Sequence, residues 1–113
     1  MKRNIKILSK SEIINIIKQN RHIIASYKVK KIGLFGSYVK NEQKITSDID
    51  LYVEFDKTAF DKDMKGLFNN YLELTGYLEK LFGRKVDILT PISIETIRIK
   101  EVAEEIKRTL VYV

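Results

Sequence analysis

The stretch that decides the fold is GLFGSYVKNEQKITSDIDLYVEF, residues Gly33–Phe55. It overlaps two apolar runs, Val29–Phe35 and Asp48–Phe55, and each has the length and composition of a β-strand. The second run begins with two carboxylates one residue apart, Asp48 and Asp50. Burying charge in a strand is unfavourable unless something compensates it. The stretch therefore predicts two strands and indicates that its carboxylate pair binds something.

The carboxylates have the chemistry of a cation site. Side chains alternate across a strand, so Asp48 and Asp50 point the same way, and they repel each other unless a cation lies between them. Oxygen ligands of this kind suit Mg²⁺. Asp87 lies in a third apolar run, Lys85–Thr90, and if this strand is a neighbour, three carboxylates converge. Such a group suits two metal ions that hold the attacking and leaving oxygens of a phosphoryl displacement. The alternative is a pair of strand-end carboxylates satisfied by water.

The Gly-Ser pair has the features of a phosphate site. Gly36 and Ser37 follow the first strand and precede a predicted short helical turn, with ten residues between Ser37 and Asp48. Backbone N–H groups, a hydroxyl and a positive helix end then meet at one point, where phosphate binds readily. An ordinary strand-to-turn junction is the other interpretation of a Gly-Ser pair taken alone. Tyr38 and Tyr52 flank these residues in the sequence, and packing is the favoured role for both.

The rest of the chain predicts a small α/β (α+β) domain. The capping-box pattern Ser9–Glu12 opens a helix predicted over Lys10–Ser26. A second helix is predicted over Thr58–Phe82, with a break near Gly66 as one option, and Gly83 is its left-handed stop. One or two short helices and a terminal strand follow Pro91. The expected core face of the long helix comprises Phe60, Met64, Leu67, Phe68, Tyr71, Leu74, Leu78 and Phe82. The expected fold is a small mixed β-sheet with helices packed on one face.

Composition limits the class of protein. The 113 residues suffice for one domain, 1–113, and the absence of cysteine excludes disulfides and thiolate metal sites. No apolar run approaches the roughly 20 residues that span a bilayer, and the basic start is too interrupted for a signal peptide. We therefore expect a cytoplasmic protein without a membrane segment.

Positive charge is concentrated at the N-terminal end. Residues 1–31 hold nine Lys or Arg against one acid, whereas residues 32–113 hold twelve against fourteen, within a net charge of +6. A basic face attracts nucleotide phosphates, nucleic acid or an acidic partner. A solvated, lysine-rich helix without any ligand is the other interpretation.

The combined motifs resemble a known family. The Gly-Ser turn, the spacer, the segment SDIDL and the later strand GRKVDIL resemble the minimal nucleotidyltransferases of the polymerase-β superfamily, over about Val29–Thr90. The resemblance implies a polymerase-β palm-like fold. It also implies metal-dependent transfer of a nucleoside monophosphate from a nucleoside triphosphate.

The resemblance assigns roles to individual residues. Asp48 and Asp50 would bind the metal ions, two Mg²⁺ being expected. Asp87 would help bind the catalytic metal and favour deprotonation of the attacking hydroxyl. Gly36 and Ser37 would hold the β- and γ-phosphates. These five residues form the predicted catalytic and phosphate-binding centre.

Three further positions complete the predicted nucleotide site. Members of the family commonly have Arg-Gly where this chain has Lys40-Asn41, so the charge is kept but the fork geometry of arginine is lost. Asn tolerates the left-handed conformation that Gly would adopt. Ser47 is predicted to cap the turn before the strand, either as part of the nucleotide site or as a plain turn serine.

The length suggests where the acceptor comes from. Only 26 residues follow Asp87, so no second domain is expected there, and a partner or a second copy of the chain must help supply the acceptor. Minimal members of this kind resemble the MntA-type antitoxin of HEPN/MNT toxin–antitoxin pairs, which implies ATP as donor and a tyrosine of a HEPN-type ribonuclease toxin as acceptor. Transfer to a small molecule or an RNA end, and a non-catalytic binding antitoxin, are the alternatives.

Overall fold

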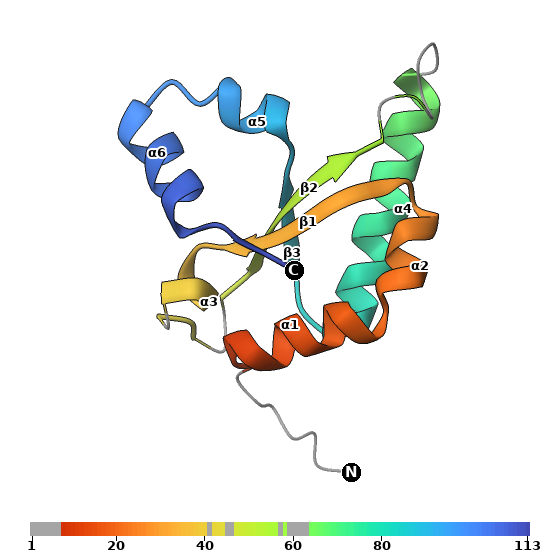
Figure 1. Ribbon diagram of the computed structural model, residues 1–113, viewed down its shortest axis with the longest axis horizontal. Helices are drawn as coiled ribbons and strands as arrows, with labels where there is room; N and C mark the ends of the chain where they lie inside the picture. Colours follow the sequence, from red (N-terminus) through yellow and green to blue (C-terminus); the bar gives the residue numbers. More distant parts are fainter. Residues whose placement is uncertain (1–7, 41, 45–46, 57, 59–63) are drawn as a thin grey trace.

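The computed structural model describes residues 8–40, 42–44, 47–56, 58 and 64–113. The chain forms α1 (Lys10–Gln19), α2 (Arg21–Ser26), β1 (Val29–Phe35), α3 (Ser37–Lys40), β2 (Ile49–Phe55), α4 (Met64–Phe82), β3 (Val86–Leu89), α5 (Pro91–Glu95), α6 (Lys100–Thr109) and β4 (Val111–Tyr112), in that order. Within these residues the strands form one sheet, and Figure 1 gives its place among the helices.

The sheet is mixed, as the sequence predicts. Its strand order is β3-β2-β1-β4, with β1 antiparallel to both β2 and β4, and β2 parallel to β3. Because β2 and β3 are parallel, the chain must cross over between them, and α4 makes that connection. The register pairs Phe35 with Asp50 and Asp50 with Asp87. The end of β1 therefore lies beside the starts of β2 and β3.

The main core lies between one face of the sheet and the helices α1, α2 and α4 (Figure 1). Alternate strand residues such as Leu34, Leu51 and Val53 point into it and are fully buried. The helices contribute the side chains Ile13, Ile17, Ile24, Leu74, Leu78 and Phe82. Each fully buried aliphatic side chain of this kind contributes about 1.5–3 kcal/mol to folding. The predicted packing of helices against one face is confirmed for the three helices that form this core.

The other face of the sheet carries a smaller layer formed by α5 and α6 (Figure 1). Phe35, Tyr52 and Ile94 are its buried members. A Cβ atom at Gly33 would lie 2.8 Å from Leu110 Cδ1 and 3.1 Å from the Val111 carbonyl, so the absence of a side chain there lets β4 approach β1 closely. This second layer adds to the predicted packing of helices on one face of the sheet.

The prediction of one helix over Lys10–Ser26 is wrong, because the chain divides there into α1 and α2 at Asn20. The capping box at its start is confirmed, since the Ser9 hydroxyl accepts a hydrogen bond from the Glu12 N–H at 3.1 Å. The Asn20 side-chain amide donates to the Ile16 carbonyl at 2.9 Å and its oxygen accepts from the Tyr77 hydroxyl at 3.2 Å. An asparagine that bonds to nearby backbone competes with the helix ladder, which explains the interruption.

The long helix departs from the prediction at Phe68, and the side chain of Met64 lies outside the described residues. Within the described residues α4 runs from Met64 through Gly66 and Gly76 without a break, and Gly83 ends it at φ +65° as expected. Phe68 was expected in the core, but it is 60% exposed and lies outside it. The predicted start of this helix before residue 64 and the expected core residue Phe60 fall outside the described residues. No helix in the described part of the chain is both long and apolar enough to cross a bilayer.

Candidate active site

The Gly-Ser turn lies directly against one of the predicted metal ligands. Gly36 separates β1 from α3 at φ +79°, and its carbonyl accepts hydrogen bonds from the N–H groups of Val39 at 3.1 Å and Lys40 at 3.2 Å. A Cβ atom at Gly36 would overlap the Asp50 carboxylate and lie 3.2 Å from its Cγ. Glycine is therefore required here both for the backbone conformation and for the space that Asp50 occupies.

Two of the three predicted carboxylates are direct neighbours across the sheet. Asp50 on β2 and Asp87 on β3 are register partners; Asp50 is half-buried and Asp87 is exposed. Burial, and after it the negative charges of Asp87 and Asp48, together raise the pKa of Asp50 to about 6. Both Asp50 and Asp87 line a cavity of about 350 Å³ beside β3. The strands thus bring the three acids within electrostatic range of one another.

This donor set fits a hard divalent cation. Carboxylates that repel one another are stabilised when a cation enters between them, and oxygen ligands are those that Mg²⁺ takes. Among the described residues, no group of three or more His, Cys, Asp or Glu side chains is gathered closely enough to hold a metal ion as it stands. Coordination by all three carboxylates together therefore stays a prediction.

The other predicted nucleotide-binding residues differ in their surroundings. Ser37 begins α3 and is half-buried. The Ser47 hydroxyl accepts a hydrogen bond from the Lys44 N–H at 2.8 Å, and the Ser47 N–H donates to the Lys44 carbonyl at 3.0 Å. Ser47 thus closes the turn before β2, as expected, while its contact with nucleotide stays a prediction. Asn41 lies outside the described residues.

Lys40 is engaged by a residue that the sequence analysis did not find. Its ammonium group forms an ion pair with Glu105 on α6, and this hydrogen bond raises the pKa of Lys40 and lowers that of Glu105. The two residues are 65 positions apart, so no local pattern could have linked them. The lysine predicted to contact phosphate is thereby held by a carboxylate of the second layer.

A further missed feature is the hydroxyl of Tyr38. Packing was the expected role, and the Tyr38 side chain is indeed fully buried in the main core cluster. Its hydroxyl oxygen, however, is buried without a hydrogen-bond partner in the structure. Tyrosine hydroxyls that are buried usually find a partner. The identity of the residue is visible in the sequence, but the isolation of its hydroxyl is a property of the folded chain.

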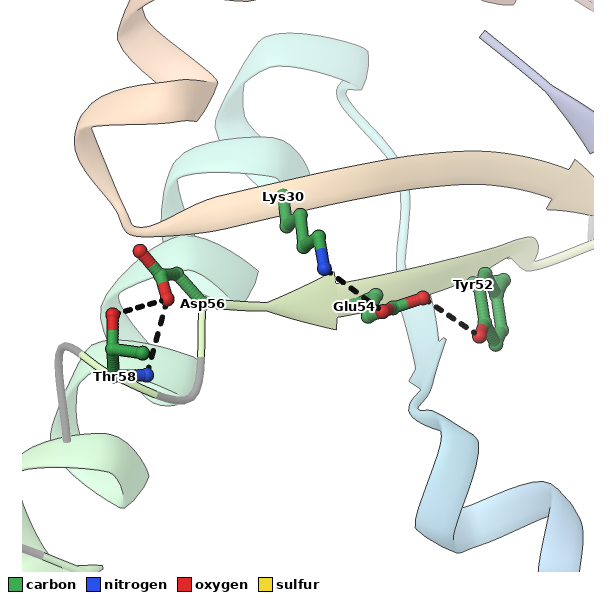
Figure 2. Close-up of polar contacts among 5 residues, drawn as sticks. All are labelled: Lys30, Tyr52, Glu54, Asp56 and Thr58. Atoms are coloured by element: carbon green, nitrogen blue, oxygen red, sulfur yellow. Dashed lines mark hydrogen bonds and ion pairs between the residues drawn. The ribbon is translucent and has the colours of Figure 1, made fainter. Parts of the chain in front are cut away.

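The acids at the end of β2 and directly after it, Glu54 and Asp56, interact with their own neighbours, as Figure 2 shows. The Tyr52 hydroxyl donates to Glu54 Oε2 at 3.4 Å, and Lys30 Nζ lies 4.0 Å from Glu54 Oε1. Asp56 Oδ1 accepts from the N–H and the hydroxyl of Thr58, at 3.1 and 2.7 Å. These acids have local structural roles, which separates them from the group around Asp50.

Known structures share this fold. A solved candidate minimal nucleotidyltransferase superposes with a TM-score of 0.66 at 20% identity, covering 92% of this chain and 95% of that one. A solved toxin–antitoxin structure with AMP-PNP superposes with a TM-score of 0.51 at 22% identity, covering 93% of this chain and 72% of that one. The fold is therefore that of the minimal nucleotidyltransferases.

Sequence comparison defines the family. A candidate protein adenylyltransferase of Methanocaldococcus jannaschii is 45% identical over 104 residues, which are 91% of this chain and 96% of the relative. The protein adenylyltransferase MntA of Thermococcus cleftensis is 36% identical over 85 residues, 75% of each chain. The family model for the nucleotidyltransferase domain matches residues 10–112. The chain belongs to the nucleotidyltransferase domain family, and it is a nucleotidyltransferase enzyme.

Proposed function

We propose that this enzyme transfers AMP from ATP to a tyrosine hydroxyl of a HEPN-type ribonuclease toxin, with Mg²⁺ as cofactor, and so acts as the antitoxin of the pair. The observation that carries the proposal is the Asp50–Asp87 register pair, held against the Gly36 turn. The protein adenylyltransferase relatives and the toxin–antitoxin neighbour support the choice of acceptor class.

In the proposed reaction the acceptor oxygen bonds to the α-phosphorus of ATP while the bond from that phosphorus to the bridging oxygen breaks. Pyrophosphate leaves and the hydroxyl proton passes to Asp87 or to solvent. Asp48, Asp50 and Asp87 would hold two Mg²⁺ ions, and Gly36 and Ser37 would hold the β- and γ-phosphates. Bound Mg²⁺ would supply charge neutralisation on the phosphates and activation of the hydroxyl.

The exposure of Asp87 supports a macromolecular acceptor. Asp87 lies on β3, the strand at the edge of the described sheet, and its side chain is exposed. A tyrosine on the surface of another protein can approach a carboxylate in that position without entering a deep pocket. A buried Asp87 would instead have favoured a small acceptor.

The proposal is tested with ATP labelled on its α-phosphate, mixed with the purified chain, Mg²⁺ and a lysate of the native source. We expect label on one small protein, its loss in Asp87→Asn, and its retention in Asp56→Asn, a matched change at an acid bonded to Thr58. ATP labelled on its γ-phosphate should transfer nothing. Label on RNA or on a small molecule would keep the chemistry and overturn the antitoxin assignment.

No label on any acceptor would favour the non-catalytic alternative, in which the chain neutralises its partner by binding alone. That alternative is separated by a neutralisation assay with the toxin and Asp48→Asn. Loss of neutralisation in this variant, with binding to the toxin retained, supports adenylylation. Full neutralisation by the variant would establish the binding mechanism instead.

A further inference from the structure

Tyr38 has a buried hydroxyl that packing alone does not require. Of the fully buried side chains in the described residues it is the largest, and its ring belongs to the core cluster that includes Ile49 and Val86. Its hydroxyl oxygen is buried and has no hydrogen-bond partner. An unpaired buried hydroxyl destabilises the folded state, and a phenylalanine of nearly the same shape would avoid that cost. The hydroxyl therefore needs an explanation other than filling space.

The surroundings of the hydroxyl supply that explanation. Tyr38 follows Gly36 and Ser37 in the turn that lies against Asp50. The helix α3 packs against β1 and β2. The start of β2 is joined to the residue before β3, because the Ile49 N–H donates to the Lys85 carbonyl at 3.0 Å. Asp48 precedes Ile49, and Arg84 precedes Lys85.

The charges of these same neighbours act on the phenol. Burial raises the pKa of Tyr38, the Arg84 guanidinium opposes that rise, and the charges of Asp48 and then Asp50 add to it. The phenol therefore stays protonated at neutral pH and is a hydrogen-bond donor beside a carboxylate pair. Its ring lies in the main core, while the cavity at Asp50 and Asp87 lies beside β3.

We propose that Tyr38 is a positioning residue whose hydroxyl donates a hydrogen bond to the Asp48 carboxylate when that carboxylate turns to bind a divalent cation. The inference rests on the metal binding in the proposed function and adds a residue to it. A hydrogen bond to one oxygen of a ligating carboxylate fixes its orientation, and loss of such a partner typically weakens metal binding 10- to 100-fold. A bound cation would thereby give the buried Tyr38 hydroxyl a hydrogen-bond partner.

This role predicts that Tyr38→Phe changes two properties in opposite directions. Measured by urea unfolding with a chelator present, the variant should be as stable as the wild type or more stable, because an unpaired hydroxyl has been removed. Measured by titration calorimetry with Mn²⁺ and no nucleotide, its dissociation constant should rise about tenfold. A merely structural tyrosine would change the unfolding and leave the Mn²⁺ affinity alone.

The matched control is Tyr77→Phe. The Tyr77 hydroxyl bonds to Asn20 at 3.2 Å, between α4 and the junction of α1 and α2. Its removal should lower stability and leave the Mn²⁺ affinity unchanged. In an Asp48→Asn background, Tyr38→Phe should have no further effect on Mn²⁺ binding, because its acceptor has already been altered.

The outcomes separate this inference from the proposed function. Mn²⁺ binding by the wild type with unchanged affinity in Tyr38→Phe would overturn the positioning role and leave the proposed function standing. A water bridging the hydroxyl would give that same result. Absence of Mn²⁺ binding by the wild type would overturn both.

Discussion

The carboxylate of Asp50 occupies the space that any side chain at Gly36 would need. A Cβ atom at Gly36 would lie 3.2 Å from Asp50 Cγ and 3.3 Å from Asp50 Cβ, and would overlap the carboxylate oxygen. Gly36 also has φ +79°, a conformation that side-chain-bearing residues rarely adopt. The Gly-Ser turn and the candidate metal ligand Asp50 are thus one structural unit, and a change in either displaces the other.

Gly36→Ala should therefore lose stability for two separate reasons. The left-handed conformation costs roughly 1–2 kcal/mol with a Cβ present, and overlap with a packed neighbour typically adds about 1–3 kcal/mol. Gly83→Ala is the matched control, because Gly83 has φ +65° but a Cβ there meets nothing within 4 Å. Urea unfolding should give a larger loss for Gly36→Ala than for Gly83→Ala, and only the former should abolish AMP transfer. Equal losses would mean that Asp50 moves aside without cost.

The pH dependence of stability should reveal the raised pKa of Asp50. In the metal-free chain this pKa is about 6 rather than 3.8, so between about pH 4 and 6 the folded state holds a proton that the unfolded state releases. Asp50 therefore contributes stability at low pH, and that contribution is lost as the pH rises toward 6. One pKa unit corresponds to about 1.4 kcal/mol, and solvent screening of a half-buried carboxylate reduces the total effect to on the order of 1 kcal/mol.

Asp50→Asn, unfolded by urea in the presence of EDTA, should then be more stable than the wild type at pH 7. The difference should shrink as the pH falls to about 4. Asp56→Asn is the control and should keep the decline between pH 4 and 6, since Asp56 is exposed and its pKa is lowered by Thr58. A stability difference that is the same at every pH would contradict the electrostatic origin of the effect.

Local sequence signals determine most of the sheet. The run Val29–Phe35 becomes β1 with the predicted bounds, and the predicted strand Asp48–Phe55 loses one residue to the turn. These two strand predictions are confirmed because their apolar residues on one face enter the core, and the alternation of apolar and polar residues in the sequence indicates that face directly. The prediction of one continuous helix across Asn20 is wrong because the Asn20 side chain also bonds to Tyr77 on α4. That contact depends on tertiary structure and leaves no local signal. The prediction of Phe68 as a core residue is wrong for a similar reason. Helical spacing shows which residues share the apolar face of α4, but it does not show how much of that face the sheet covers.

The candidate site likewise combines residues that the sequence predicts with contacts that it does not predict. Asp50 and Asp87 could be placed on one face from strand alternation, and their register follows once β2 and β3 are neighbours. The partner of Lys40 could not be predicted, because Glu105 is 65 residues away on a helix with no buried residue. The unpaired hydroxyl of Tyr38 likewise depends on how α3 packs against β1 and β2. Pairings of this kind are set by the assembled layers and leave no local pattern.

The Lys40–Glu105 ion pair should oppose nucleotide binding. If Lys40 contacts phosphate as the family pattern implies, ATP must draw it away from Glu105, whose carboxylate hydrogen bond raises the pKa of the lysine. Glu105→Gln removes the competing charge, so the KM for ATP should fall about two- to fivefold with kcat little changed, the modest size reflecting an exposed pair. Lys40→Ala should raise the KM instead.

Initial rates of label transfer at varied ATP, with Mg²⁺ in excess, measure this effect. Glu104→Gln is the matched control, because Glu104 pairs with Lys100 along α6, 3.8 Å from its ammonium, and does not face Lys40. It should leave the KM unchanged, and added salt should narrow the difference between the wild type and Glu105→Gln by screening the exposed pair. A KM in Glu105→Gln equal to that of the wild type at low salt would mean that Lys40 takes no part in holding the triphosphate.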